Sequence, residues 1–166
     1  DKPFNAKQLR NFFQKIITYY ENNGYPFASI RLDSITINDT KLAAQLFIEK
    51  NKRYKIDSVL LKGNARITSQ YIKNYIRIKD GELYNEESIR KISARIKELP
   101  FVTEEKKWKV VFTEKESKIL LYLKKKQASR FDGILGLLPD NETGKLRLTG
   151  DLKLNLINSF HNGEKI

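Results

Sequence analysis

The segment Lys145–Ile157, KLRLTGDLKLNLI, alternates between apolar and polar residues with a period of two. One face carries five leucines and a glycine: Leu146, Leu148, Gly150, Leu152, Leu154 and Leu156. Only a β-strand presents this pattern as one apolar face, because a helix repeats every 3.6 residues. About 9–11 residues let a tilted strand cross the hydrocarbon core of a bilayer. The pattern therefore predicts either a strand in an antiparallel sheet of a soluble protein or a strand with its leucines toward lipid.

A second, glycine-rich strand is predicted just before this alternating segment, at Phe131–Leu138. The residues Pro139–Gly144 form a strong turn signal between the two strands, and Ser159–Glu164 begin another turn. A single hairpin neither closes a barrel nor buries its own face. We therefore expect residues 128–166 to be the beginning of a larger β-structure.

The composition excludes several classes of protein. The chain has 166 residues, 40% of them hydrophobic, which is enough for one ordinary domain or two small ones. It contains no cysteine, so disulfides, thiolate catalysis and cysteine metal sites are excluded. No apolar run reaches the roughly 18 residues of a transmembrane helix. The start, Asp1–Phe4, lacks a signal-peptide pattern, so an exported protein would be seen here as a mature chain or a fragment.

The net charge of +12 does not by itself point to nucleic acid. Lysines are spread among aspartates and glutamates through most of the chain, and the only dense run is Lys124–Lys126. No RNP motif, zinc finger or basic recognition helix is present. A solvated basic surface is the simplest interpretation, and attraction to an anionic membrane surface is the alternative.

The first part of the chain predicts a helix followed by two strands. Residues 5–22 have one apolar face at helical spacing, and Gly24 ends the helix. The strand that starts near Ala28 changes phase near Ser34, which indicates a bulge or bend. A second alternating strand runs from Leu42 to Ile48.

A complete β-α-α-β-β unit is predicted after Tyr54, in about 70 residues. Its first strand ends at Gly63-Asn64, and Thr68 and Asn85 are expected to cap its two helices. Pro100 closes the second helix, and Lys79–Gly81 break the first. The unit's second and third strands carry alternating apolar residues: Trp108, Val110, Phe112, Ile119, Leu121 and Leu123. The helix and two strands predicted before Tyr54 therefore repeat the last helix and two strands of this unit.

Several short motifs of this unit, in this order, resemble the POTRA (polypeptide-transport-associated) modules of the BamA/TamA outer-membrane assembly family. The motifs are Tyr54–Val59 with Gly63-Asn64, Gly81–Asn85, Leu99–Phe101 and, in the preceding part, Asn23–Ala28. The segments Phe131–Gly136 and Gly150–Phe160 are similar to the opening strands of the family's barrel.

This resemblance implies an α+β fold of tandem POTRA modules, each a three-stranded sheet with two helices. Residues 1–53 would be the C-terminal part of one module, residues 54–127 a complete module, and residues 128–166 the first antiparallel hairpin of an outer-membrane β-barrel. The protein would lie in the outer membrane of a Gram-negative bacterium, as surface antigens of this family do, with its POTRA modules in the periplasm.

The resemblance also implies a function in assembly: POTRA modules receive unfolded client chains and pass them to the barrel. In the family's strand order the second strand lies at a sheet edge, where a client can add by β-augmentation. The edge would be formed by Lys107, Lys109, Val111 and Thr113, with Trp108, Val110 and Phe112 facing the core. A proline at Val111 is expected to remove an edge donor. Pairing with a neighbouring module only is the alternative.

Two further surfaces follow from the same resemblance. Five leucines of the last strand would face lipid: Leu146, Leu148, Leu152, Leu154 and Leu156. The run Lys124, Lys125 and Lys126 would form a basic joint near anionic headgroups, or simply a soluble strand end. Tyr75, Tyr84 and Trp108 are expected in or against the core.

No catalytic or metal site is expected, and no cofactor. His161 is the only histidine and lies in a polar turn, so no histidine pair can bind a metal or relay a proton. The sequence has no nucleophile elbow and no phosphate-binding glycine loop. Expected partners are unfolded outer-membrane or secreted clients, outer-membrane lipid, periplasmic chaperones and lipoprotein accessory subunits, but not nucleic acid.

Three alternatives stay open at this stage. A pore for two-partner secretion and a lipase-linked outer-membrane protein would carry related modules before a related barrel. A soluble basic nucleic-acid-binding protein is the third, and it predicts binding that falls steeply with salt.

Overall fold

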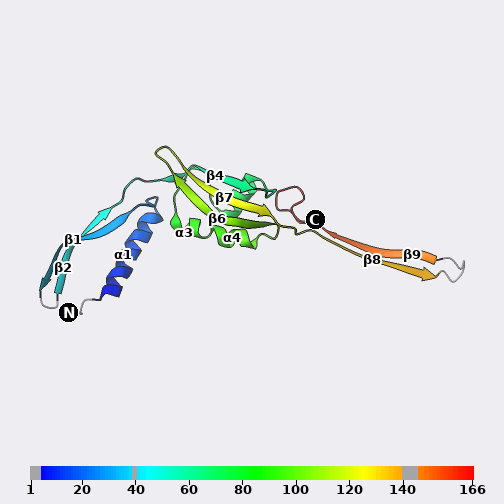
Figure 1. Cartoon of the computed structure of the whole chain (residues 1–166), viewed down its shortest axis with the longest axis horizontal. Coiled ribbons are helices and arrows are strands. Elements are labelled where there is room, and N and C mark those ends of the chain that lie inside the picture. The colour runs from blue at the N-terminus through cyan, green and yellow to red at the C-terminus, as the bar shows by residue number, and fades with distance from the viewer. Residues whose placement is uncertain (1–4, 39–40, 140–145) are drawn as a thin grey trace.

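The computed structural model describes residues 5–38, 41–139 and 146–166. Figure 1 shows an elongated molecule with three parts in a row: α1, β1 and β2 at one end, a mixed α/β unit in the middle, and a long hairpin of β8 and β9 at the other end. The last residues of the chain return from the hairpin to the middle unit. The middle unit therefore contacts both other parts.

The first part contains one helix and one two-stranded sheet, as predicted. Helix α1 (Ala6–Glu21) begins after Asn5, whose side chain accepts hydrogen bonds from the backbone N–H groups of Lys7 and Gln8 at 2.9 and 3.2 Å. Strand β1 (Ser29–Asn38) pairs antiparallel with β2 (Lys41–Glu49). The register shifts between Asp33 and Thr36, so the bulge predicted near Ser34 is confirmed. No residue of α1 is buried, so the described residues of this part enclose no core of their own.

The middle unit is a three-stranded sheet in the order β4-β7-β6. Strand β4 (Ser58–Gly63) lies parallel to β7 (Ser117–Lys125), which pairs antiparallel with β6 (Val102–Phe112). A short ladder of β3 (Lys55–Ile56) and β5 (Glu82–Leu83) closes one end. Helices α2 (Ser69–Ile76), α3 (Glu86–Arg90) and α4 (Ile92–Glu98) pack against the sheet, and Figure 1 shows α3 and α4 on one face of it.

The core of this unit lies between the helices and the sheet. Its buried apolar residues come from every element of the unit except the short β5: Ile56, Val59, Ile72, Ile76, Ile78, Tyr84, Ile89, Ile92, Ile96, Leu99, Phe101, Val102, Ile119, Leu121 and Leu123. As predicted, Tyr84 is buried, while Tyr75 and Trp108 are half-buried against this core. The predicted α+β class is thereby confirmed.

The predicted helix caps are present, but some element bounds differ. Thr68 accepts a hydrogen bond from the N–H of Tyr71 and Asn85 from that of Ser88, as N-caps do. Helix α2 ends at Ile76, because Arg77 adopts a left-handed conformation at φ +54° and closes the helix before the predicted break at residues 79–81.

Two other bounds differ from the apolar pattern. The single helix predicted between Asn85 and Pro100 is divided at Lys91 into α3 and α4. Strand β6 starts at Val102 instead of near Lys107. The sequence pattern missed its first residues because Thr103–Lys106 are polar or charged and show no apolar alternation.

The hairpin pairs β8 (Arg130–Pro139) with β9 (Leu146–Asn155) over ten positions. The predicted turn at 139–144 lies outside the described residues except for Pro139. Strand β9 ends two residues before the alternating pattern does, because the backbone of Leu156 instead pairs with Ile166 at 2.8 and 2.9 Å. This second pairing turns the chain back toward the middle unit.

Candidate functional site

Strand β6 lies at an edge of the sheet, since β7 is its only partner among the described strands. Trp108, Val110 and Phe112 are half-buried against the core, as expected for the inner face of this strand. The four residues proposed to face a client, Lys107, Lys109, Val111 and Thr113, are exposed, Val111 with 40% of its surface. The geometry therefore offers a free edge, and client binding there stays a prediction.

The backbone of this edge corrects one expectation. The N–H of Thr113 donates to the carbonyl oxygen of Glu116 at 2.9 Å, and Val111 lies opposite Lys118 in the register. Hydrogen-bonded pairs alternate along an antiparallel ladder, so Val111 bonds to Lys118 and its N–H points into the sheet. The prediction that Val111 supplies an edge donor is wrong. The outward N–H groups belong to Val110 and Phe112.

The free edge is short because β6 is irregular in its first half. The register shifts between Glu104 and Lys106 and again between Lys106 and Lys109. Bulges of this kind twist an edge and limit pairing with other chains. Beyond these shifts, residues 109–112 of β6 keep a regular register with β7 and a free edge.

A cavity of about 470 Å³ lies beside the edge, between β6 and helices α3 and α4. Its lining residues are Glu86, Arg90, Ser93, Lys107 and Trp108. The indole N–H of Trp108 is buried and has no hydrogen-bond partner among the described residues. An unpaired buried donor is unusual in a native fold, and it belongs to one of the residues that line this cavity.

Charged groups hold the start of α3 in place next to this cavity. Glu86 accepts hydrogen bonds from the hydroxyl of Tyr84 and from Arg90, the latter at 2.6 Å. Burial, followed by the bond to Glu86, raises the pKa of Tyr84 above its ordinary value. Burial and the neighbouring Glu86 likewise raise the pKa of Glu21, at the end of α1. The end of α1 and the start of α3 therefore share one electrostatic environment.

The first part of the chain is fixed to the middle unit at the same place. Asn22 accepts a hydrogen bond from the N–H of Glu87 at 2.9 Å through its side chain, and one from the Asn85 amide at 3.0 Å through its backbone. Phe112, on the edge strand, packs its ring 5.0 Å from that of Phe27 and 4.8 Å from that of Tyr54. These contacts join the two parts directly beside the free end of β6.

The hairpin presents one continuous apolar face. Its register places Phe131 opposite Leu154 and Leu137 opposite Leu148, so these residues of the two strands lie on the same side. Leu148, Leu152 and Leu154 are 67, 67 and 60% exposed. Leu156 is half-buried, and the side chain of Leu146 lies outside the described residues.

The other face of the hairpin is mostly polar. Asp132 lies opposite Lys153 and Gly136 opposite Thr149, and the apolar Ile134 faces Asp151. Sequence reasoning assigned the lipid-facing role to the leucines of the second strand only. The register adds Phe131, Leu135 and Leu137 of β8 to the same face.

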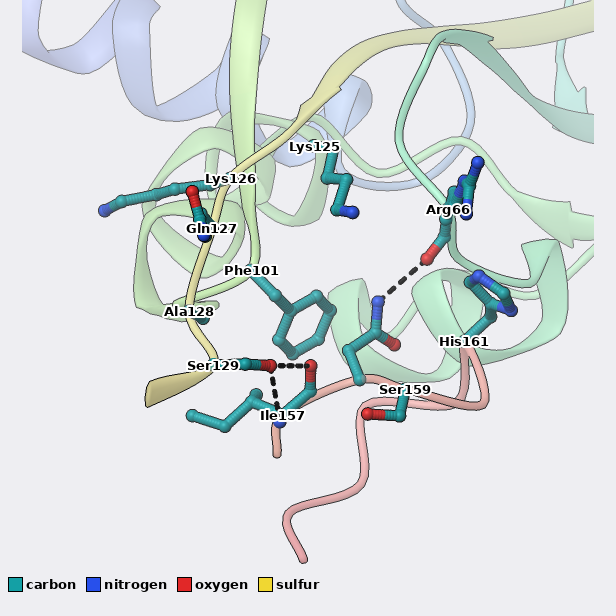
Figure 2. Close-up of a pocket in the computed structure, with 11 residues that line it drawn as sticks. Arg66, Phe101, Lys125, Lys126, Gln127, Ala128, Ser129, Ile157, Ser159 and His161 are labelled. Atoms are coloured by element: carbon teal, nitrogen blue, oxygen red, sulfur yellow. Dashed lines mark hydrogen bonds between the residues drawn. The ribbon is translucent and has the colours of Figure 1, made fainter. Parts of the chain in front are cut away.

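The three lysines of the basic joint do not act as one group. Lys124 forms an ion pair with Glu105 at 3.0 Å and does not line the nearby cavity. Lys125 and Lys126 line a cavity of about 610 Å³, together with Arg66 and residues of the C-terminal segment (Figure 2). Sequence reasoning missed Arg66, which lies about 60 residues away and carries no local signal of this contact.

The described residues give no indication of a metal centre. No three histidine, aspartate or glutamate side chains gather in the part of the chain that the structure describes. His161 lines the cavity of Figure 2. Among the described helices, none has the length and apolar composition needed to cross a membrane.

Comparisons with known proteins agree with this geometry. Residues 54–117 match the family model described as POTRA, surface antigen variable number repeat. The fold is similar to that of BamA from Haemophilus ducreyi lacking POTRA domains 1–3, with a TM-score of 0.64 and 14% identity over 96% of this chain and 29% of that one. It is also similar to POTRA3-5 of Haemophilus influenzae BamA, with a TM-score of 0.54 and 22% identity over 75% of this chain and 52% of that one.

Residues 54–117 are therefore a POTRA module, and the expected resemblance to BamA/TamA-type proteins is confirmed. The likeness to the two BamA structures extends beyond the module to the first part of the chain and, in the first case, to the hairpin. The chain spans less than a third of the length of that first structure.

Proposed function

We propose that this chain is the junction between the periplasmic POTRA modules and the membrane barrel of a protein that assembles or secretes outer-membrane clients in a Gram-negative bacterium. The observation that carries the proposal is the hairpin register, which gathers the apolar residues of two strands on one exposed face next to a POTRA module. The proposal includes the domain boundaries: residues 1–53 are the C-terminal part of one POTRA module, residues 54–127 are a complete module, and residues 128–166 are the first hairpin of the barrel.

The hairpin has the dimensions of a membrane-spanning unit. Each strand has ten residues, within the roughly 9–11 residues with which a tilted barrel strand crosses the hydrocarbon core. Its apolar face would meet acyl chains and its polar face the lumen of a barrel. Large exposed apolar faces of this kind are unfavourable in water, which supports a lipid environment.

The POTRA module would receive clients at β6. An extended client segment can pair with the outward N–H and C=O groups of Val110 and Phe112, and this pairing is largely independent of the client's side chains. The adjacent cavity, whose lining includes Glu86, Arg90 and Ser93, would take a polar side chain of the client. Lys107 and Lys109 would flank the client on the exposed side.

A photo-crosslinking experiment tests this edge. A photoreactive amino acid at Lys109 is expected to crosslink to an unfolded outer-membrane precursor, whereas the same group at Lys118, on the central strand β7, is not. Val110→Pro removes an outward donor and should reduce crosslinking from Lys109 at least about fivefold if one backbone bond of roughly 1 kcal/mol is lost. Equal crosslinking from both positions, or no effect of Val110→Pro, would contradict client binding at β6.

A further inference from the structure

The cavity at the base of the hairpin is built by four segments that are separated in sequence. Arg66 comes from the loop before α2, Phe101 from the residue before β6, and Lys125–Ser129 from the end of β7 and the residues after it, at the same end of the β6–β7 pair. The C-terminal segment contributes Ile157, Asn158, Ser159 and His161. In Figure 2 the Lys125 ammonium group points into the space between the strand end and the C-terminal segment, with Arg66 on the other side of this space. The Lys126 side chain extends away from it. The cavity exists only because the C-terminal segment docks on the module.

Hydrogen bonds hold this C-terminal segment in position. The Asn158 side chain donates to the carbonyl oxygen of Arg66 at 2.8 Å, and the N–H of Ile157 donates to the hydroxyl of Ser129 at 3.2 Å. The N–H of Thr68, at the start of α2, donates to the carbonyl oxygen of His161 at 3.1 Å. The walls of the cavity are therefore fixed before any ligand arrives.

The charge of the cavity has one sign. Its lining contains Arg66, Lys125 and Lys126 but no carboxylate. None of these three cations forms an ion pair with another described residue, in contrast to Lys124 beside them, which is paired with Glu105. An unpaired cluster of cations in a concave site attracts an anion, and its field is focused by the low-dielectric walls.

The floor of the cavity is apolar. Phe101 is buried in the core of the module, and Ala128 and Ile157 pack against that core half-buried. A site with cations at its rim and an apolar floor suits an anion that carries hydrocarbon, more than a bare inorganic ion.

The position of the cavity selects among such ligands. It adjoins Arg130, where β8 and the apolar face of the hairpin begin, so it lies at the level of the lipid headgroups if that face spans the bilayer. Resting on the proposed function in this respect, we infer that the cavity binds the phosphate headgroup of an anionic phospholipid, with Arg66 and Lys125 at the phosphate and Phe101 and Ile157 beside the glycerol and first methylenes.

The test is a titration with a short-chain lipid below its micelle concentration. The ¹⁵N-labelled chain, held in neutral maltoside micelles, is titrated with dihexanoyl phosphatidylglycerol while the amide shifts of Gln127, Ser129 and Asn158 are followed. Saturable shifts are expected. The double variant Arg66→Gln, Lys125→Gln should weaken binding about 25-fold, which corresponds to roughly 1 kcal/mol for each cation near an anionic lipid.

A matched double variant controls for general charge. Lys62→Gln with Lys124→Gln removes the same two charges at the same end of the sheet but outside the cavity, and should change the affinity less than about threefold on the same scale. Equal weakening by both double variants would overturn the inference, because it would show general attraction only.

Two further ligands complete the test. Dihexanoyl phosphatidylcholine and inorganic phosphate are both expected to give no saturable shift at these amides. Saturation by inorganic phosphate with equal affinity would overturn the lipid assignment. Because the measurement follows amides at the cavity and compares two double variants of equal charge, it depends neither on insertion of the hairpin into a bilayer nor on client crosslinking at β6, so this inference and the proposed function can fail separately.

Discussion

Proline substitutions at two neighbouring residues of β6, Val110 and Val111, should have different effects on the stability of the module. The N–H of Val111 points to Lys118 inside the sheet, whereas that of Val110 points out of the edge. Val111→Pro removes one ladder bond and leaves the carbonyl oxygen of Lys118 unpaired on the central strand, which costs about 1–3 kcal/mol. Val110→Pro removes no bond within the module and keeps an apolar ring at a half-buried position.

Thermal unfolding followed by circular dichroism measures this difference. For a domain of about 60–100 residues, 1 kcal/mol corresponds to about 4–8 °C in Tm. A loss near 2 kcal/mol in Val111→Pro therefore predicts a Tm roughly 8–16 °C lower, and Val110→Pro should shift Tm by less than about 5 °C on the same scale. Equal losses, or a larger loss in Val110→Pro, would refute the register and the identification of the free edge.

Three other perturbations follow from the described contacts. Gly63 has φ +101° and a Cβ there would lie 2.3 Å from a backbone oxygen of β7, so Gly63→Ala should lose at least about 2 kcal/mol in urea unfolding, more than Gly81→Ala, where φ is +81° and the space is open. The raised pKa of Glu21 means that the folded state holds this proton more tightly, so stability falls as pH rises through the raised value. Glu21→Gln should therefore raise Tm at pH 7, and this gain should vanish below the ordinary pKa of 4.5. Asn22→Ala removes the acceptor of the Glu87 N–H, and hydrogen exchange at that amide should accelerate by about fivefold for a bond of roughly 1 kcal/mol. Unchanged exchange would show that this bond does not hold the two parts together.

Local signals in the sequence predict much of the fold. The caps at Thr68 and Asn85, the bulge at Ser34 and the two hairpin strands all depend on residues within a few positions of each other. Such short-range patterns are strong because the backbone responds directly to capping oxygens and to side-chain alternation. The structure confirms these caps, the bulge and the two strands.

Other features depend on contacts that local patterns do not contain. The apolar stripe runs on through Lys91, so nothing in it marks the division between α3 and α4. The first half of β6 is charged and bulged, and no alternation announces it. The direction of the Val111 N–H follows from the pairing register with β7, which alternation of side chains cannot fix.

The basic cavity shows the same limit at longer range. The run Lys124–Lys126 is visible in the sequence, but only the structure separates Lys124, paired with Glu105, from the two lysines that line the cavity. Arg66 and His161 enter it from segments about 60 and 35 residues away. Tertiary docking of the C-terminal segment brings them together, and no periodicity encodes that docking.

The orientation of the hairpin's apolar face toward lipid is the central claim, and site-directed spin labelling of β9 measures it directly. Nitroxides placed one at a time along residues 148–154 of the protein in lipid bilayers report collisions with oxygen, which concentrates in the acyl region. The account predicts high oxygen accessibility at Leu148, Leu152 and Leu154, and low values at Asp151 and Lys153, with a period of two. Equal accessibility on both faces, or the opposite phase, would contradict it.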